Sequence, residues 1–374
     1  MVDTSDTSVP LRVLHLTAGS DAGGLSRYIF DLGAAMHARG HQVAVAGQRG
    51  AWHWLFESAP FPWIDAPMKA GPFGLRTAAR VLLDWMKDHP VDLLHVHYRK
   101  CSMVGRQIQK ICPVPILYTL HLSDLQVGWP WSYFTDFGDH VHAASSEARD
   151  WLIESAKVKA ENISLVPHGI DPVRFPLTTE SQRSAARQAL GFCPADLVAV
   201  FVGRLDSPKN EGWLLDLADR SRDRLPGLKM VLVGEGPHEQ MLRRRVVRQK
   251  LRERVFLLGH REALPIYQAA DALLLPSRRE GFSLVCAEAM STGIPVLRTR
   301  TAGTSELVIE NQTGRSVAID RDKFIGAAIE FLSDLPALAS MGKCAAEHVH
   351  AKFTFEKQLH DTIGLYRSVV SRRR

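Results

Sequence analysis

Short aliphatic segments alternate with longer segments of helical periodicity along almost the whole chain, and this alternation limits the possible folds more than any other feature. Strands are predicted near residues 11–18, 41–47, 92–97, 115–121, 140–144, 163–167, 197–203, 228–233, 254–258, 272–275 and 294–298. Helices are predicted near residues 24–38, 75–88, 102–111, 145–156, 180–190, 210–224, 237–250, 261–269, 283–291, 321–341 and 355–370. Alternation of this kind is typical of parallel sheets that helices cover on both faces. The sequence therefore predicts an α/β protein made of doubly wound sheets.

The length of 374 residues favours two domains, because a single hydrophobic core seldom grows that large. Glycine, aspartate and two prolines cluster between Gly169 and Pro176, and we expect the domain boundary there. The predicted domains are residues 1–170 and 171–354, followed by a C-terminal helical segment, 355–374. The strand near 163–167 is expected to open the second run of strands.

Composition excludes several classes of protein. Apolar residues make up 45% of the chain and charged residues 23%, as in ordinary soluble globular proteins. No apolar run reaches the roughly 18 to 20 residues that cross a bilayer, and the segment MVDTSDTSVPLR lacks the cationic start and apolar core of a secretion signal. The five cysteines include no C-x-x-C pair, which fits a reduced compartment. We therefore expect a cytoplasmic protein.

The segment PSRREGFSLVCAEAMSTG, residues 276–293, is the richest candidate for a functional site. An aliphatic strand should end near Pro276 and helical periodicity begins near Ser283, so the local pattern is strand, glycine turn, helix. The first amides of such a helix have no internal partner and form a site for phosphate oxygens. Glu280 and Glu288 lie at or just inside this helix, near the same phosphate. Taken alone, the two glutamates could equally be solvated surface charges.

A second segment, GRLDSPKN at residues 203–210, follows another aliphatic strand and leaves Arg204 and Lys209 in the turn before a helix. Arginine offers a fixed fork of donors and lysine a mobile point charge, and both suit a diphosphate. Nearer the N-terminus, Gly23 and Gly24 follow a strand and open a helix, where glycine lets the backbone approach a ligand closely. The chain contains neither the dinucleotide fingerprint G-x-G-x-x-G nor a P-loop.

Histidines mark three of the predicted strands. His121 ends one of them in the run YTLHLSD, where a neutral imidazole could bond a hydroxyl group. His95 and His97 alternate along another strand, as do His140 and His142 along a third, and alternation puts each pair on one face of a sheet. Such pairs can bind a metal. Because no carboxylate cluster accompanies them in the sequence, we expect no metal site.

Together, EGFSLVCAE and GRLDSPKN resemble the E-x7-E and G-R-L-x-x-x-K signatures of the retaining GT-B glycosyltransferases of family GT4, also called glycosyl transferases group 1. The resemblance runs from about Leu11 to Gly314 and is strongest after Leu197. The chain departs from the family pattern where Asn210 replaces a glycine and where Ala302-Gly303 replaces a glycine pair. The resemblance implies two Rossmann-like domains that face each other across a cleft. The N-terminal domain would bind the acceptor, the C-terminal domain the nucleotide sugar, and the last helix would cross back to the first domain.

The resemblance also implies roles for particular residues. The implied catalytic residues are His121, Arg204, Lys209 and Glu280. Glu280 would contact the donor sugar, and Arg204 and Lys209 the diphosphate. The residues implied for the donor nucleotide are Gly23, Gly24, Gly234, Gly236, Phe282, Ser283, Leu284 and Glu288, the last of them on the ribose. Glu306, in the run TRTAGTSELV, and His168, in VPHGIDPVRF, would be further contacts.

The implied reaction moves a hexose-type sugar from a UDP- or GDP-sugar to a hydroxyl of a saccharide or lipid-linked saccharide, with retention, as in polysaccharide biosynthesis. No metal or other cofactor is expected, since Arg204, Lys209 and the helix amides would neutralise the diphosphate. Two alternatives are a nucleotide-sugar epimerase or hydrolase on the same fold and a non-catalytic nucleotide-sugar-binding protein; the intact Arg204, Lys209, Glu280 and Glu288 argue against the latter. A nicotinamide-dependent oxidoreductase is disfavoured by the missing fingerprint.

The net charge of +6 and the pI near 9.1 suggest an anionic partner or a solvated basic surface. A dense run, LRRRVVRQKLRERV at residues 242–255, supplies much of this charge, and Arg372, Arg373 and Arg374 add to it. Polybasic helices gain roughly 1 kcal/mol per cation at an anionic membrane. Peripheral contact with the inner face of a membrane is therefore one interpretation, and a solvated helix face is the other. No nucleic-acid-binding motif accompanies the cations, so we expect no nucleic acid partner.

Overall fold

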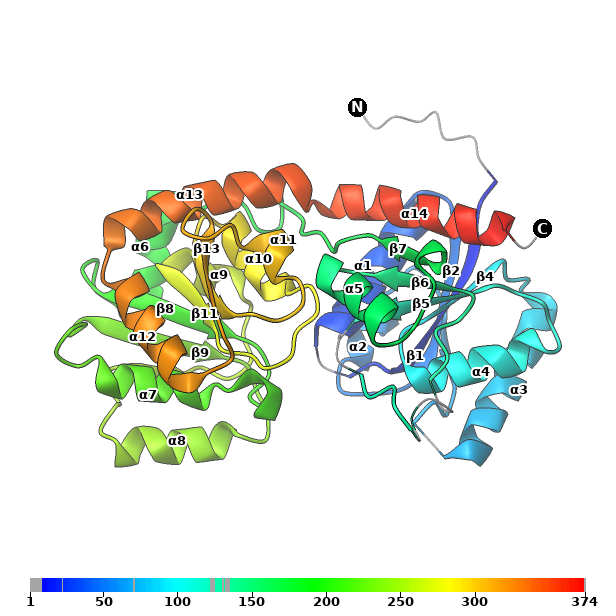
Figure 1. Cartoon of the computed structure of the whole chain (residues 1–374), viewed down its shortest axis with the longest axis horizontal. Helices are drawn as coiled ribbons and strands as arrows, with labels where there is room; N and C mark the ends of the chain where they lie inside the picture. The colour runs from blue at the N-terminus through cyan, green and yellow to red at the C-terminus, as the bar shows by residue number, and fades with distance from the viewer. Residues whose placement is uncertain are drawn as a thin grey trace. The chain divides into compact units, whose positions relative to one another are not determined.

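The computed structural model describes residues 9–21, 23–69, 71–121, 125–129, 131 and 135–372. Contacts between Cα atoms divide the chain into two compact units, each with its own parallel sheet (Figure 1). Unit 1 takes the ranges Met1–Ala144, Ala148–Val166 and Leu359–Arg374, and unit 2 takes Ser145–Glu147 and Pro167–Gln358. The α/β class expected from the strand–helix alternation is confirmed.

Seven parallel strands form the sheet of unit 1, in the order β3-β2-β1-β4-β5-β6-β7. The strands are β1 (Arg12–Gly19), β2 (Gln42–Gln48), β3 (Trp63–Asp65), β4 (Leu93–Val96), β5 (Ile116–Leu120), β6 (His140–Ala143) and β7 (Ile163–Leu165). The helices are α1 (Gly24–Ala38), α2 (His53–Glu57), α3 (Pro72–Asp88), α4 (Arg99–Gln109), α5 (Ser146–Glu154) and α14 (Phe355–Ser371), whose first residues belong to unit 2. The direction of the chain through the sheet reverses between β1 and β4, and ligands commonly bind at such a switch point.

Six parallel strands form the sheet of unit 2, in the order β10-β9-β8-β11-β12-β13. The strands are β8 (Leu197–Val202), β9 (Leu228–Val233), β10 (Val255–Leu257), β11 (Ala272–Leu275), β12 (Val296–Thr299) and β13 (Gly314–Val317). The helices are α6 (Glu180–Ala189), α7 (Gly212–Arg220), α8 (Glu239–Arg248), α9 (Leu264–Ala269), α10 (Leu284–Ser291), α11 (Thr304–Leu307), α12 (Arg321–Leu332) and α13 (Leu335–Lys352). Here the switch point lies between β8 and β11, which pair directly.

The observed elements correct two of the predictions and add elements that were not predicted. The segment near 163–167 does not open the second sheet, because β7 pairs with β6 at the edge of the first. The single helix expected near 321–341 is two helices, because the Asp334 carboxylate accepts a hydrogen bond from the Ala337 amide and starts a new helix with Pro336 in its first turn. Strands β3 and β13 and helices α2 and α11 were not predicted. The elements β3, α2 and α11 have only 3, 5 and 4 residues, and β13 carries polar side chains at a sheet edge.

The central strands of both sheets are buried on their two faces, but the two sheets bury different kinds of side chain. In unit 2, strand β11 has the sequence ALLL with every side chain fully buried, and β8 and β9 are almost as aliphatic. Each leucine removed from water contributes roughly 2 kcal/mol to stability. In unit 1, the central strands also bury polar side chains, namely His15, His95, Thr119 and His142. These side chains lie on four neighbouring strands, β1, β4, β5 and β6, the first two of which flank the switch point.

Within the described ranges, no single helix is long and apolar enough to cross a membrane. The pair α12 and α13, which bends by 97° at its break, meets the length and composition requirements only when the two are taken together. Apolar side chains of both helices, such as Phe324 and Val349, are buried inside unit 2.

Candidate functional site

The loops after β8 and β11 begin side by side in unit 2, because these two strands pair at the switch point. The loop after β11 leads into α10, whose N-cap residue is Ser283, and the Ser283 side chain makes no hydrogen bond to the helix amides. Phe282 and Ser283 are buried, and Leu284 is half-buried. The helix therefore starts against the core and its N-cap side chain leaves the first amides to another acceptor, as in helix termini that bind phosphate.

An ion pair joins the two sequence motifs that end at these strands. Lys209 Nζ lies 2.6 Å from Glu280 Oε1, and both side chains are mostly buried. A second contact ties the same loops, since Asn210 Nδ2 donates to the Pro276 carbonyl oxygen at 2.9 Å. The fold thus brings together Lys209 and Glu280, which are 71 positions apart in the sequence.

The departure from the family pattern at Asn210 preserves the local backbone. Asn210 has a φ of 50° and a ψ of 30°, in the left-handed region. Glycine adopts this region without strain, and asparagine is among the few other residues that tolerate it. Asparagine therefore keeps the turn that a glycine would make and adds the side-chain bond to Pro276.

Arg204 stands apart from the Lys209–Glu280 pair. Its Nε lies 3.1 Å from Asp206 Oδ2, and its side chain is 58% exposed, against 20% for Lys209. The guanidinium group is therefore held on one side by a carboxylate and is still open to an anionic ligand on the other.

Gly234 and Gly236 are required by the backbone of the Arg204 loop. A Cβ atom at Gly234 would lie 1.9 Å from the Gly203 carbonyl oxygen, and one at Gly236 would lie 2.3 Å from the Leu205 carbonyl oxygen. Gly234 also has a φ of 135°, which other residues rarely adopt. These glycines let the loops after β8 and β9 pack backbone against backbone. Their contact with a nucleotide stays a prediction.

Glu288 on α10 is held by a buried tyrosine that sequence reasoning missed. The Tyr267 hydroxyl donates to Glu288 Oε2 at 3.0 Å. Burial, followed by the neighbouring Glu288 charge, raises the pKa of the Tyr267 phenol well above its usual range, so the phenol stays protonated and remains a donor. Tyr267 belongs to α9 and lies 21 positions from Glu288, outside either motif, so no local signal identified it.

Glu306 and His168 have neighbours within the protein itself. Glu306 Oε1 accepts hydrogen bonds from the backbone N and the Oγ of Ser146, each at 2.6 Å. Burial raises the pKa of the Glu306 carboxyl group. The His168 ring is buried and lies edge-on to Phe282, with 5.8 Å between ring centroids. His168 therefore supports the loop before α10, and a ligand contact of either residue stays a prediction.

Sequence reasoning also missed Arg298, a fully buried arginine on β12. Its guanidinium group donates to the carbonyl oxygens of Gly303 at 3.2 Å and Ala302 at 3.1 Å and to Thr301 Oγ1 at 2.6 Å. The same loop packs against the α10 turn, since a Cβ atom at Gly303 would lie 2.7 Å from the Gly281 carbonyl oxygen. Arg298 thus fixes the loop behind the candidate phosphate site. The available signal was an arginine that directly follows the buried aliphatic residues Val296 and Leu297 in a strand.

In unit 1, the glycine turn and His121 come together through one helix. Gly23 is the N-cap of α1 with a φ of 143°, and Gly24 is the first residue of that helix. Tyr28 of α1 packs edge-on against the His121 ring, with 5.4 Å between centroids. Burial lowers the pKa of His121 to about 3, so its imidazole is neutral at physiological pH. Contact of Gly23, Gly24 or His121 with a ligand stays a prediction.

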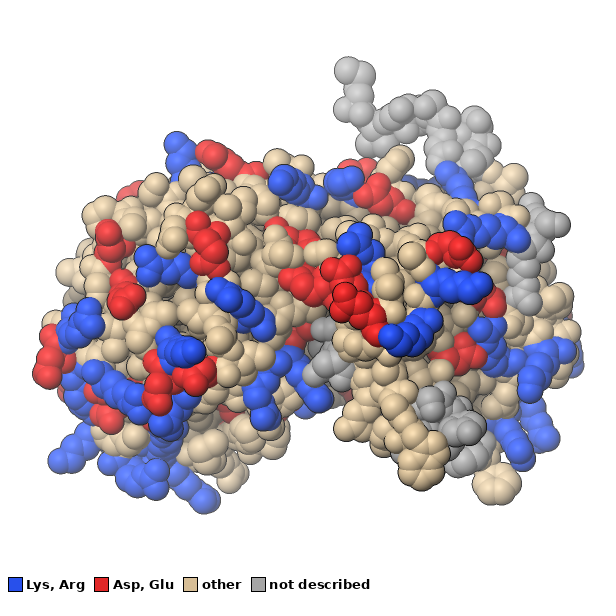
Figure 2. Space-filling view, viewed as in Figure 1, with Lys and Arg blue, Asp and Glu red and all other residues tan. Residues whose placement is uncertain are grey.

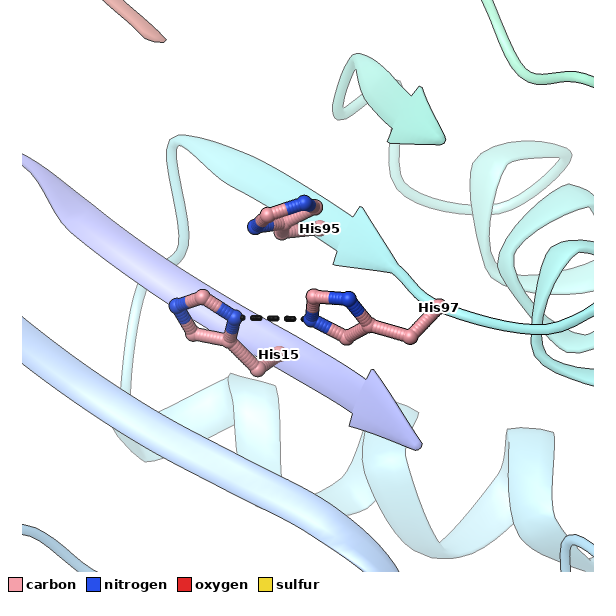
Figure 3. A group of neighbouring side chains, drawn as sticks. All are labelled: His15, His95 and His97. Atoms are coloured by element: carbon pink, nitrogen blue, oxygen red, sulfur yellow. Dashed lines mark hydrogen bonds between the residues drawn. The ribbon is translucent and has the colours of Figure 1, made fainter. Parts of the chain in front are cut away.

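His15, His95 and His97 gather at the switch point of unit 1, and their possible ligand atoms lie within 4.8 Å of one another (Figure 3). These nitrogens are mostly engaged in hydrogen bonds. Both ring nitrogens of His97 face other histidines, and both ring nitrogens of His95 face the hydroxyl groups of Tyr366 and Thr119. A metal needs several nitrogen lone pairs that converge on one point. The arrangement therefore favours a hydrogen-bonded network over a metal centre.

Comparison with known proteins agrees with the sequence resemblance. Residues 22–174 match the model of Glycosyltransferase Family 4, and residues 196–334 match the model of Glycosyl transferases group 1. The chain is 29% identical to the D-inositol 3-phosphate glycosyltransferase of Corynebacterium urealyticum over 74% of this chain and 72% of that protein. It is 25% identical to the glycogen synthase of Mycobacterium tuberculosis over 92% of this chain and 91% of that protein.

A solved structure extends the likeness to the fold. Anabaena Alr3699/HepE in complex with UDP-glucose matches with a TM-score of 0.82 and 23% identity, covering 96% of this chain and all of that one. At this identity the match shows the shared GT-B architecture of two parallel sheets. The two family models together span most of the sequence, from residue 22 to residue 334. The chain therefore belongs to the family 4, group 1 glycosyltransferases, enzymes of the GT-B fold that act on nucleotide sugars.

Proposed function

We propose that this enzyme transfers a hexose from a UDP- or GDP-sugar to a hydroxyl group of a saccharide or lipid-linked saccharide, with retention at the anomeric carbon. The observation that carries the proposal is the Lys209–Glu280 ion pair at the start of α10. Relatives named D-inositol 3-phosphate glycosyltransferase and glycogen synthase, and a neighbour solved with UDP-glucose, support a nucleotide-sugar donor and a hydroxyl acceptor.

The ion pair suits a site that must hold a sugar and a diphosphate together. The Lys209 ammonium group has three protons, one of which points to Glu280 Oε1 at 2.6 Å. Its other protons can reach phosphate oxygens, while the second carboxylate oxygen of Glu280 can accept hydrogen bonds from sugar hydroxyls. Because both side chains are mostly buried, these interactions act in a medium of lower dielectric constant than water and are correspondingly stronger.

Negative charge grows on the diphosphate as the anomeric C–O bond breaks. Lys209, the exposed fork of Arg204 and the amides of Phe282, Ser283 and Leu284 would stabilise that charge. Donors that are already oriented toward developing charge contribute roughly 3 to 4 kcal/mol each. Since the protein supplies its own cations, we propose that transfer needs no resident metal.

Retention requires the acceptor to attack the face from which the diphosphate leaves, unless a covalent intermediate forms. We propose front-face attack, in which the leaving phosphate oxygen takes the acceptor proton. Glu280 then orients the sugar through hydrogen bonds and forms no covalent bond to its anomeric carbon, while Oε1 stays paired with Lys209.

The acceptor is proposed to bind unit 1. A cavity of about 690 Å³ lies beside the carboxyl ends of β2 and β3, and its lining includes Arg49, Asp65 and Lys69. Lys69 Nζ donates to Asp21 Oδ1 at 2.7 Å, which links this cavity to the turn before α1. Charged and hydrogen-bonding groups of both signs suit a polar acceptor such as a saccharide.

Helix α8 is the proposed site of peripheral contact with an anionic membrane. Basic side chains gather over this helix (Figure 2). Arg244 and Arg248 are exposed on it, and so are the apolar side chains of Val247, at 52%, and Met241, at 46%. Cations beside exposed apolar groups favour the interface of an anionic bilayer. On this proposal the enzyme works in the cytoplasm at the inner face of the membrane.

Thermal denaturation with UDP, GDP, ADP and their sugars tests the donor. A nucleotide at 100 times its Kd stabilises the folded state by about 2.7 kcal/mol, a clearly measurable shift in Tm. We expect a shift with UDP or GDP that shrinks in Glu288→Gln and persists in the surface control Glu253→Gln. The absence of a shift with any nucleotide would overturn the proposal.

The reaction itself is tested by NMR of the products. Retention predicts that the anomeric configuration of the donor reappears in the glycoside. Fast release of free sugar or of an epimer without any acceptor would instead support a hydrolase or an epimerase.

A further inference from the structure

Two hydrogen-bonded chains of histidines run through the interior of unit 1, and neither is explained by transfer chemistry alone. The first chain joins His121, His97 and His15, and the second joins His95 to His142 through Thr119. Burial keeps His15, His97, His121 and His142 neutral, since it lowers the pKa values of His15 and His121 to about 3 and that of His142 to about 4, and lowers the pKa of His97 well below its usual range. A neutral imidazole carries one N–H group and one lone pair. Each ring therefore donates at one nitrogen and accepts at the other.

The second chain has only one possible direction. His142 Nε2 lies 2.7 Å from the Val166 carbonyl oxygen, which can only accept, so His142 carries its proton on Nε2. Its Nδ1 then accepts from the Thr119 hydroxyl at 2.9 Å. With that proton used, Thr119 Oγ1 accepts from His95 Nε2, and His95 Nδ1 accepts from the Tyr366 hydroxyl at 2.7 Å. Both histidines of this chain are thus Nε2–H tautomers.

The first chain has two possible directions, and all three rings must follow the same one. His97 Nδ1 lies 2.9 Å from His121 Nε2, and His97 Nε2 lies 3.0 Å from His15 Nδ1 (Figure 3 shows the second contact). If His121 donates to His97, the chain ends with a proton on His15 Nε2. If His15 donates to His97, the chain ends with a proton on His121 Nδ1.

The inner end of the chain decides between them. His15 Nε2 is buried and has no hydrogen-bond partner among the described residues. A proton there would make a buried N–H group without an acceptor, the rarest kind of unsatisfied polar group in folded proteins. The opposite direction leaves only a lone pair at that position. His121 is less buried than His15, so an N–H group at its Nδ1 can find an acceptor outside this row of histidines.

We infer that His97 and His15 are positioning residues that hold His121 with its proton on Nδ1, so that His121 offers a hydrogen-bond donor to a hydroxyl or phosphoryl oxygen of the substrate. The substrate part of this inference rests on the proposed function and on the catalytic role that the family resemblance implies for His121. The row of histidines does not conduct protons to solvent, because its inner end, His15, is fully buried. Its role is to orient the ring and to fix its tautomer, which makes His121 a donor and not a general base at this nitrogen.

Nitrogen-15 NMR of the histidine side chains tests the tautomers directly in the apoprotein. We expect His15, His97 and His121 to be Nδ1–H and His95 and His142 to be Nε2–H, so that the second chain serves as an internal control. The His121 signals are assigned by their loss in His121→Gln. An Nε2–H signal for His121 in the wild-type protein would overturn the inference.

A matched pair of variants tests the positioning role. In His15→Gln the side-chain amide can still donate to His97 Nε2, so we expect His121 to stay Nδ1–H and kcat to remain within about twofold of wild type. In His15→Leu no donor remains, so we expect mixed tautomers at His121 and a kcat reduced at least 5-fold with KM for the acceptor unchanged. An unaltered His121 spectrum in His15→Leu would refute the role. Should His15→Leu fail to fold, the wild-type spectrum still decides the direction of the chain.

This test separates the inference from the proposed function. An Nδ1–H signal at His121 in a protein that transfers no sugar would sustain the tautomer assignment and remove the substrate role. Sugar transfer by a protein whose His121 gives an Nε2–H signal would sustain the proposed function and overturn the tautomer assignment.

Discussion

The two sheets share one architecture but put their polar groups in different places. In unit 1, histidines lie inside the sheet layer, fully buried and hydrogen-bonded to one another. In unit 2, the central strands are aliphatic, and the ionisable groups of the candidate site lie in the loops beyond the strand ends, where Lys209 meets Glu280. Arg298 on β12 is the exception, a fully buried cation within a strand of unit 2.

This difference has a physical consequence for each unit. Burying a histidine in a core is favourable only while its ring stays neutral, so the stability of unit 1 should depend on pH. Charged groups at strand ends remain partly hydrated and can face a ligand, so those of unit 2 should matter more for turnover than for folding.

Acid should destabilise unit 1 before unit 2. Burial lowers the pKa values of His15 and His121 to about 3 and that of His142 to about 4, and it lowers the pKa of His97 well below its usual range. The unfolded chain therefore takes up protons near pH 6.5 while the folded chain does not, and stability falls as the pH drops from about 6.5 toward 3. At pH 5.5 each such histidine lowers the free energy of unfolding by roughly 1.4 kcal/mol, and the four together lower it by about 5.6 kcal/mol.

Tryptophan fluorescence can follow this transition, because Trp213 is the only one of the eight tryptophans that lies in the sequence of unit 2. In the background Trp213→Phe, urea unfolding at pH 7.5 and 5.5 then reports on unit 1. Replacing His142 by Gln should reduce the difference between the two pH values by about 1.4 kcal/mol, whereas His37→Gln on the surface of α1 should not change it. Equal stability at both pH values would show that the buried histidines are not kept neutral.

Lys209→Met should produce the next largest effect, which is a loss of turnover. Removal of one oriented cation is expected to lower kcat by roughly 100- to 1000-fold. The change also leaves Glu280 without its partner, so the double variant Lys209→Met/Glu280→Gln separates stability from chemistry. The double variant should recover the free energy of unfolding without recovering kcat. Lys229→Met on β9 is the control, and a rate for Lys209→Met within twofold of wild type would remove Lys209 from the mechanism.

Much of the architecture could be predicted because it follows from local patterns. Strand and helix positions came from hydrophobic periodicity, and only elements of three to five residues, or with polar side chains at a sheet edge, were missed. The break between α12 and α13 was missed because a capping aspartate interrupts an apolar pattern without changing its period. Assignment of β7 to the first sheet depends on pairing with β6, which no local signal encodes.

The residues of the candidate site also fall into those that local patterns predict and those that only tertiary contacts reveal. Lys209 and Glu280 could be proposed because each follows a recognisable strand in a motif, and the fold then brought them to 2.6 Å. Tyr267 and Arg298 could not, since their roles arise from contacts with Glu288 and with the loop at Gly303 that depend on tertiary packing. His95 and His97 were noticed as an alternating pair, but their link to His15 and His121 needed three neighbouring strands in register.

Arg298→Met tests the role of the arginine that is buried within strand β12 of unit 2. The variant keeps most of the side-chain volume and leaves the carbonyl oxygens of Ala302 and Gly303 without their donor. Unsatisfied buried acceptors cost about 1 to 3 kcal/mol, so we expect the free energy of unfolding to fall by roughly 2 kcal/mol. Arg300→Met, which changes an exposed side chain on the next turn, should stay within about 0.5 kcal/mol of wild type. A similar loss in both variants would mean that Arg298 is not the specific support of this loop.

Tyr267→Phe should have the smallest effect and the most specific one. The phenyl ring keeps the packing of α9, while Glu288 Oε2 loses the hydrogen bond that directs it. Loss of one hydrogen bond to a carboxylate should cost about 1 kcal/mol of nucleotide binding, roughly a 5-fold rise in Kd by calorimetry. If Glu288 holds the ribose, the loss should disappear with a 2′,3′-dideoxynucleotide, which has no hydroxyl for Glu288 to bind. Tyr118→Phe in unit 1 is the packing control. A loss of the same size for the dideoxynucleotide would show that Tyr267 acts on the shape of the pocket and that Glu288 does not contact the ribose.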